Sequence, residues 1–488
     1  MANSLISEVR QGRFWITGSV GIAGALLAGF LIATAGYVGS AVVVMLPLAL
    51  LVLIGILLEP RFGMLVYLQY SFLINVLGRF AQIDFPFGVI VDGILVLTAL
   101  SVVLNGKRME WHRLNHPTFY LLSIWFMYTL LQLFNPEAPN KQAWLIHARP
   151  FSLHWFFVGF IMLVTPIQRS DMVILLRTWL IWSLLAALWA FKQQYIGLTP
   201  GEQLWLDTFG AKTHLLFGHL RSFSFYSDAS QFGAEMAGVS LICLILLLER
   251  KQWISRLGYL VLILIYFWGY AVSGTRSALF ILLAGYPFYL LLKRDFTKIL
   301  AGGGAAAVLL GILLYTNIGN DNYQIFRIRT ALRPLEDASF LVRLENQQKL
   351  ANYLQHLPFG AGIGTSGDAG ARFSPDHFAA QIPPDSWFVE LWIETGIVGL
   401  TLYILMLLAI IGIGTYKIWH LNDPWLRTMM YLFIAEFTGV AVMGYSNPVI
   451  GQFPTSSIVF ISSILFTSCD RWDTPVRKPN AEQVPASW

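Results

Sequence analysis

The stretch PPDSWFVELWIETGIVG (383–399) brings three carboxylic acids to the start of an apolar run, namely Asp385, Glu390 and Glu394. A carboxylate within hydrocarbon costs several kcal/mol unless it is hydrated or paired, so acids in this position need a chemical or structural reason. A positioned carboxylate can accept the proton of an attacking hydroxyl group. An Asp just before a helix can instead cap its free N–H groups. Both interpretations of Asp385 stay open, and His377 and Glu390 are the alternative bases.

Arginines gather in segments that are expected to leave the membrane on the same side. Arg221 and Asp228 occur in HLRSFSFYSDASQFG, and Arg276 occurs in YAVSGTRSALF, between two apolar runs with almost no loop. A planar guanidinium can donate two parallel hydrogen bonds to phosphate oxygens, so these arginines predict a phosphate or pyrophosphate site. Interface anchoring and pairing with loop acids are the structural alternatives. The candidate ligands are Arg221, Arg276, Arg343, Arg372 and Asp228.

A glycine-rich segment and several histidines give weaker signals. The segment HLPFGAGIGTSGDAG (356–370) could cradle phosphate through backbone N–H groups. It lacks the Gly-Lys-Ser/Thr of a nucleotide-binding loop, and a compact, packed turn is the alternative. The spacing of His214, His219, His356 and His377 matches no metal motif. We therefore expect no metal and no cofactor.

The composition excludes an ordinary soluble enzyme. Of 488 residues, 56% are hydrophobic and only 12% are charged, which is typical of a multi-span membrane protein. The net charge of +5 does not indicate nucleic-acid binding, because membrane proteins concentrate Lys and Arg in cytoplasmic loops. Two cysteines, Cys243 and Cys469, give neither a disulfide framework nor a Cys-type metal site. The sequence predicts an all-α integral membrane protein.

Apolar runs long enough to cross a bilayer recur along the chain and predict a polytopic helical bundle of about 14 (about 12–14) transmembrane helices. If the N-terminus is cytoplasmic, most loop Lys and Arg residues fall inside, both termini are inside, and two long connections face outward. The N-terminus lacks a small-residue cleavage site, so the first apolar segment is expected to stay as an anchor. The predicted spans are 14–33, 38–58, 62–78, 87–104, 116–133, 150–166, 172–191, 229–248, 255–273, 277–292, 299–316, 387–413, 424–445 and 453–469.

Four segments, in this order, resemble the O-antigen ligase and polymerase superfamily of bacterial envelope glycosyltransferases. They are RSFSFYSDASQFGAEMA, SGTRSALFILL, VRLENQQKLANYLQHLPFGAGIGTS and DSWFVELWIETGIVGL. In the last segment, Ser386, Gly396 and Gly399 fall on the spacing of the ligase signature, and Asp385 stands where ligases carry a histidine. The resemblance covers roughly residues 200–470.

The resemblance implies a GT-C-like fold and glycan transfer from an undecaprenyl-pyrophosphate carrier, on the periplasmic side of the bacterial inner membrane, without metal or nucleotide. We expect a polymerase of O-antigen, capsule or exopolysaccharide repeat units, with a ligase acting on lipid A-core or protein as the alternative. A transporter is the alternative from another class, but ionisable residues inside the spans are few, chiefly Asp92, Arg177 and Glu436. Expected partners are the carrier-linked glycan, an acceptor glycan or lipid A-core, membrane lipids, and flippase and chain-length regulator proteins, but no nucleic acid.

The expected organisation follows from the spans and from this resemblance. Long loops without linker composition are more often functional than idle, so the two external connections should carry the site. The predicted parts are N-terminal transmembrane helices (1–191), a periplasmic loop (192–228), central transmembrane helices (229–316), a large periplasmic loop (317–386), C-terminal transmembrane helices (387–470) and a cytoplasmic tail (471–488).

Overall fold

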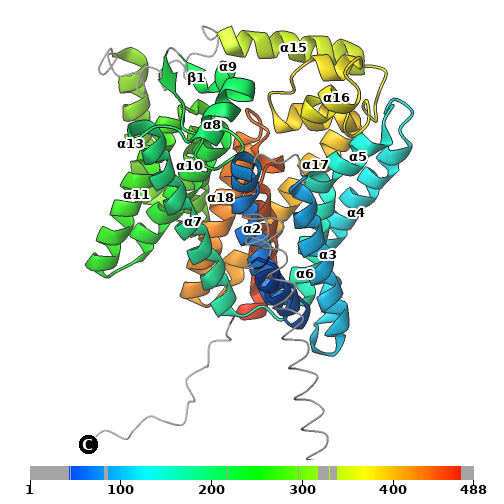
Figure 1. Cartoon of the computed structure of the whole chain (residues 1–488). Helices are drawn as coiled ribbons and strands as arrows, with labels where there is room; N and C mark the ends of the chain where they lie inside the picture. The colour runs from blue at the N-terminus through cyan, green and yellow to red at the C-terminus, as the bar shows by residue number, and fades with distance from the viewer. Residues whose placement is uncertain are drawn as a thin grey trace, which may run out of the picture.

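The computed structural model describes residues 45–81, 86–216, 218–294, 296–316 and 338–473, together with positions 43 and 329. Helices make up most of this part of the chain and run side by side between two ends of a bundle (Figure 1). Its strands are one antiparallel hairpin, β1 (Leu215–Leu216) and β2 (His219–Leu220). The predicted all-α, polytopic architecture is confirmed.

The longer helices form the body of the bundle, and short helices and single turns occupy its connections. The longer ones are α2 (Pro60–Ala81), α3 (Gly88–Leu104), α4 (Pro117–Leu131), α6 (His154–Val164), α7 (Arg169–Tyr195), α10 (Ala229–Glu249), α11 (Trp253–Ser273), α12 (Leu279–Lys293), α13 (Phe296–Tyr315), α15 (Ala338–Leu354), α17 (Trp387–His420), α18 (Pro424–Met443) and α19 (Thr455–Thr467). The shorter ones are η1 (Gly106–Arg108), η2 (Trp111–Leu114), η3 (Gln132–Phe134), α5 (Lys141–Ala148), η4 (Arg149–Leu153), α8 (Pro200–Trp205), η5 (Leu206–Gly210), α9 (Ala211–His214), η6 (Arg276–Ala278), α16 (Gly367–Phe373), η8 (Phe378–Gln381), η9 (Val449–Gly451) and η10 (Cys469–Trp472).

The predicted spans agree with the helices wherever the chain is described. Within the described residues, seven helices are long and apolar enough to cross a membrane, and Met45–Leu58, Gly88–Leu104 and Thr455–Thr467 are shorter apolar helices. The predicted span 14–33 lies outside the described residues, and 38–58 is described only in part. The number of about 14 spans therefore stays a prediction.

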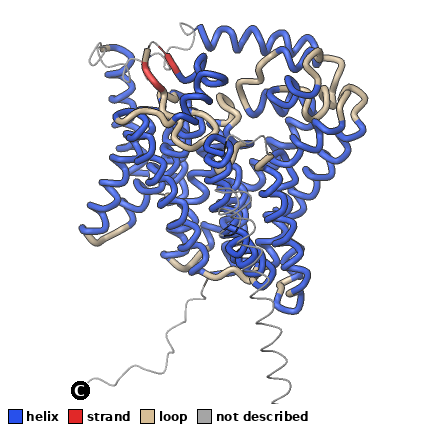
Figure 2. The backbone as a smooth tube through the Cα atoms, viewed as in Figure 1, coloured by secondary structure: helices blue, strands red, loops and turns tan. Residues whose placement is uncertain are grey.

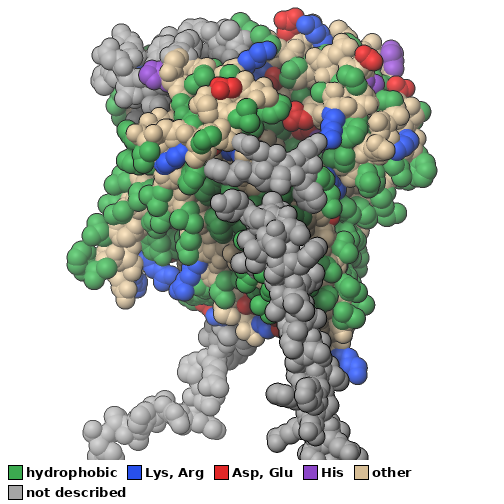
Figure 3. Space-filling view, in the orientation of Figure 1, with side chains coloured by type: hydrophobic (Ala, Val, Ile, Leu, Met, Phe, Trp, Pro, Cys, Tyr) green, Lys and Arg blue, Asp and Glu red, His purple; other side chains and the backbone are tan. Residues whose placement is uncertain are grey.

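Both long connections lie at the same end of the bundle, which we call the loop end. In Figure 1, α8, α9 and β1 of the first connection and α15 and α16 of the second lie together at the top of the molecule. Figure 2 shows loops and the hairpin concentrated at this end. Charged side chains gather at the loop end and at the opposite end, and hydrophobic side chains dominate the flank between them (Figure 3). This distribution is the one that a bilayer requires.

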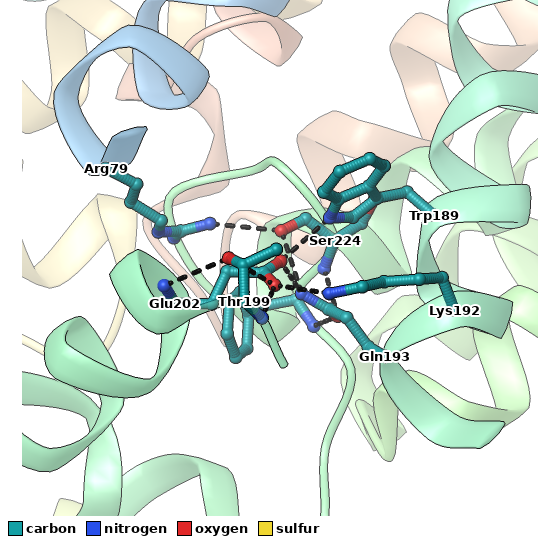
Figure 4. Close-up of polar contacts among 8 residues, drawn as sticks. Arg79, Trp189, Lys192, Gln193, Thr199, Glu202 and Ser224 are labelled. Atoms are coloured by element: carbon teal, nitrogen blue, oxygen red, sulfur yellow. Dashed lines mark hydrogen bonds and ion pairs between the residues drawn. The ribbon is translucent and has the colours of Figure 1, made fainter. Parts of the chain in front are cut away.

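A buried carboxylate fastens the first connection to α7. Glu202 accepts hydrogen bonds from Trp189 Nε1 at 2.7 Å, Lys192 Nζ at 3.0 Å and Gln193 Nε2 at 2.7 Å (Figure 4). Its carboxylate also completes a capping box with Thr199 at the start of α8. Burial alone would raise the pKa of Glu202, but these donors lower it below its usual value. The loop that carries Arg221 is thus held in a fixed position.

Arg79 at the end of α2 shows that an arginine near the loop end can be wholly structural. Its guanidinium donates to the carbonyl oxygen of Ser224 at 3.1 Å (Figure 4). It also donates to the carbonyl oxygens of Ser227, at 2.8 Å, and Tyr226. The same group lies 4.3 Å from the centre of the Trp205 ring. Residue type alone therefore does not identify the phosphate ligands.

Helix α17 is broken near its start, and the break is filled by the glycine-rich loop. Gly396 has φ of 68° and ψ of −173°, a conformation that only glycine adopts readily. A Cβ atom there would lie 2.1 Å from the carbonyl oxygen of Pro358. The amide of Ala361 donates to the carbonyl of Ile393 at 2.8 Å, so the loop satisfies a carbonyl that faces the break. The part after the break, 397–420, is by itself long enough to cross about 30 Å of hydrocarbon.

Candidate active site

A cavity of about 830 Å³ opens at the loop end, where the ends of several helices converge. Its walls come from the α9–hairpin region, the start of α10, the α11–α12 junction, α15, the start of α17 and the end of α18. This volume is within the range of small-molecule and cofactor pockets. No single segment of the sequence forms the cavity, so only the fold brings its residues together.

The cavity collects four of the residues expected at the site, Arg221, Arg276, Arg343 and Asp385. Lys212 adds a further cation to the same lining. The basic side chains therefore outnumber the acid, which suits an anionic ligand. The sequence predicted that arginines and a carboxylate would form the site, and the structure shows that these residues line one cavity.

Asp385 occupies an unusual backbone position just before α17. Its φ is 43°, in the left-handed region that Asp and Asn enter more readily than other non-glycine residues. The N-cap of α17 is Ser386, whose side chain accepts from the amide of Val389. The capping interpretation of Asp385 is therefore wrong. The carboxylate instead faces Arg343, with 4.0 Å between Oδ2 and Nε.

Arg221 is fixed by three hydrogen bonds that join two walls of the cavity. Its Nε donates to the carbonyl oxygen of Ser273, Nη1 donates to that of Thr213, and Nη2 donates to Thr275 Oγ1, each at 2.9 Å. Arg221 is thus a preorganised cation that also supports the α11–α12 junction.

The end of α18 completes the cavity by linking the Arg276 turn to the start of α17. Asn447 donates to Ser277, the residue after Arg276 in η6. The carbonyl oxygen of Gly444 accepts from the Trp387 amide at 3.0 Å. Nothing in the sequence marks this segment as functional, because its neutral polar residues carry no recognisable motif.

Three other predicted site residues lie outside the cavity lining. Asp228 caps α10 by accepting from the amides of Ser230 and Gln231 at 2.6 and 3.0 Å. His377 caps η8, and burial lowers its pKa. Arg372 is exposed, and its guanidinium lies over the Phe373 ring.

Glu390 belongs to a second polar cluster, which the sequence did not reveal. Its Oε1 lies 3.0 Å from Nε2 of His147 in α5, and Glu394 Oε2 lies 3.5 Å from the same nitrogen. The two glutamates share one helix face, as their spacing predicts, but that face meets His147 and does not line the cavity. Burial alone would lower the pKa of His147, but Glu394 and Glu390 raise it to about 9.

The rest of the cavity lining combines hydroxyl groups with apolar side chains. Hydroxyl and amide groups can bind polar ligand groups, and apolar groups beside them suit an apolar part of a ligand. The lining thus offers cations, polar groups and an apolar wall together. The polar set is Thr213, Ser230, Thr275, Ser277, Gln347, Ser386, Tyr445, Ser446 and Asn447, and the apolar set is Leu216, Phe280, Phe340, Val342 and Leu344.

Residues 261–404 match the family model described as O-Antigen ligase. This segment is similar to the O-antigen ligase family. An O-antigen polymerase from Salmonella muenchen is 26% identical over 192 residues, a match that covers 39% of this chain and 46% of that relative. The chain therefore aligns with about half of the polymerase's length. The predicted resemblance to the O-antigen ligase and polymerase superfamily is confirmed. The apolar helices are those of a multi-pass membrane protein.

The O-antigen ligase segment supplies only part of the cavity. It contributes Arg276, Arg343 and Asp385, whereas Arg221 and Lys212 come from the connection before it. The segment also contains the broken start of α17 and the glycine-rich loop. That loop packs its glycines against neighbouring backbone and does not line the cavity.

Proposed function

We propose that this chain transfers a glycan from an undecaprenyl-pyrophosphate carrier to an acceptor sugar, and that it polymerises repeat units of O-antigen, capsule or exopolysaccharide. The observation that carries this proposal is the cavity that unites Arg221, Arg276 and Arg343 with Asp385. Similarity to an O-antigen polymerase over part of its length supports the same assignment.

The cavity residues suit a direct displacement. The acceptor hydroxyl oxygen attacks the anomeric carbon while Asp385 takes its proton. The bond between the anomeric carbon and the pyrophosphate oxygen breaks, and the carrier leaves with the electron pair. Arginines stabilise the charge that grows on that oxygen. This scheme assigns the proton and the leaving-group charge to side chains of the chain itself, so it needs neither a metal in the cavity nor a nucleotide.

A deletion strain tests whether the product is a polymer. In a cell whose O-antigen is built by this protein, deletion is expected to leave single repeat units on lipid A-core, because ligation continues without polymerisation. Gel analysis of lipopolysaccharide, with the wild-type gene restored as the control, gives the readout. Bare core with long glycan retained on the carrier would indicate a ligase and would contradict the polymerase assignment.

The proposed reaction also requires the loop end to face the periplasm. Reporter fusions at Lys107, Lys251 and Lys293 are expected to report the cytoplasm, and fusions at Lys212 and Gly364 the periplasm. The physical reason is that basic loops stay inside, while both long connections lie together at the other end (Figure 1). A cytoplasmic signal at Gly364 would separate the cavity from the periplasmic glycan and end this proposal.

A further inference from the structure

The cluster of His147, Glu390 and Glu394 lies apart from the cavity and has the composition of a metal site. One ligand atom from each of the three residues lies within 4.8 Å of the others. They come from two helices far apart in the sequence, α5 and the short arm of α17 before its break at Gly396. Glu390 and Glu394 are buried, and the His147 side chain is 20% exposed.

One oxygen of the cluster lacks the partner that its burial requires. Glu394 is 0% exposed, and its Oε1 accepts from Ser366 Oγ at 2.8 Å. Its Oε2 has no hydrogen bond, although it lies 3.5 Å from His147 Nε2. A buried carboxylate oxygen without a partner is costly. This oxygen faces the point where the other two ligand atoms meet.

A proton on His147 does not satisfy both glutamates. The single N–H at Nε2 can point to Glu390 Oε1, at 3.0 Å, and then leaves Glu394 Oε2 unpaired. A divalent cation can bind all three atoms at once, and it balances two carboxylates around a neutral imidazole. We propose that His147, Glu390 and Glu394 form a binding site for a divalent transition-metal ion.

The distances and ligand types favour zinc, with manganese as the closest substitute. Metal–ligand bonds of about 2.1 Å in a tetrahedral site place neighbouring ligand atoms about 3.4 Å apart, close to the 3.0 and 3.5 Å between His147 and the two glutamates. One imidazole with two carboxylates suits these ions better than calcium, which takes oxygen ligands. The partly exposed side of His147 leaves room for a water as fourth ligand.

The ion would have a structural role. It would join α5 to the short arm of α17, and through the Ser366–Glu394 hydrogen bond it would also fix the glycine-rich loop. This inference does not depend on the proposed glycosyl transfer, because none of the three ligands lines the cavity.

The test measures metal in the full-length protein, purified in detergent with an affinity tag that contains no histidine. Protein stripped with a chelator is incubated with zinc chloride or manganese chloride, desalted and analysed by mass spectrometry of the elements. The wild type is expected to retain about one zinc per chain, and Glu394→Gln and His147→Gln are expected to bind it at least about 10–100-fold more weakly. Matched changes at exposed positions, Glu345→Gln and His356→Gln, are expected to retain zinc.

The unfolding temperature of the wild-type protein gives a second measurement, which does not require any variant to fold. Chelation is expected to lower the unfolding temperature, and zinc is expected to restore it, because an ion that binds only the folded state stabilises it. Two results together would overturn the proposal. The wild-type protein would retain neither zinc nor manganese, and its unfolding temperature would not change when the chelator is added. The protonated imidazole would then be the occupant of the cluster.

Discussion

Asp385→Asn is expected to lower glycan transfer by roughly 10²–10⁴-fold, the usual effect of losing a positioned base. The backbone should tolerate the change, because Asn enters the left-handed region about as readily as Asp, and Asp385 has φ of 43°. The helix start should also survive, because Ser386 provides the cap. The measurement is transfer from purified undecaprenyl-pyrophosphate oligosaccharide, with no metal or nucleotide added, at equal protein level.

Two further variants test whether the loss is specific to a base at position 385. Asp376→Asn changes an exposed acid of the same connection and is expected to leave transfer unchanged. Asp385→His installs the residue that ligases carry at this spacing, and partial activity there would support the assignment of a base. Near-normal transfer by Asp385→Asn would refute the role of Asp385 and direct the search to other groups of the cavity.

Arg276→Lys is expected to reduce transfer about 10- to 100-fold although the positive charge remains. A lysine offers a point charge and cannot reproduce the two parallel hydrogen bonds of a guanidinium. A lost charge-assisted contact costs about 1.5–3 kcal/mol, which gives that range if the contact acts in the transition state. The same transfer assay measures this loss, and the initial rate should fall more than the affinity for the carrier.

Arg372→Lys is the matched control for this change. The sequence places both arginines in the phosphate site, but the structure shows Arg276 lining the cavity and Arg372 exposed over Phe373. The control should therefore keep near-normal transfer. Full activity of Arg276→Lys and of Arg276→Ala, at normal protein level, would show that Arg276 only anchors the helix hairpin.

The spans could be predicted because one physical rule governs them. A run of about 20 apolar residues forms a helix in a bilayer, and the described helices follow the predicted runs. Arginines and a carboxylate were expected to act together, and Arg221, Arg276, Arg343 and Asp385 do share one cavity. Position was less predictable. Four residues that suited the chemistry lie outside the cavity lining, namely Asp228, Arg372, His377 and Glu390.

Tertiary contacts between distant segments account for what the sequence did not reveal. His147 is separated from Glu390 by 243 residues, and no motif or periodicity connects α5 with α17. The cap at Ser386 could not be distinguished from one at Asp385, because both residue types cap helices well. The backbone angles of Asp385 and Ser386 decide which residue is the cap. The start of α17 is in turn hydrogen-bonded to the end of α18, through the Trp387 amide and the Gly444 carbonyl.

The break at Gly396 separates the first turns of α17 from the long apolar part that follows. Val389 and Ile393 of this short arm share a small apolar core with Leu350 and Leu354 of α15. Loop amides replace the helix's own at the break, as with Ala361 and Ile393. The short arm is thus packed on α15, the helix that places Arg343 4.0 Å from Asp385 at the start of the same arm.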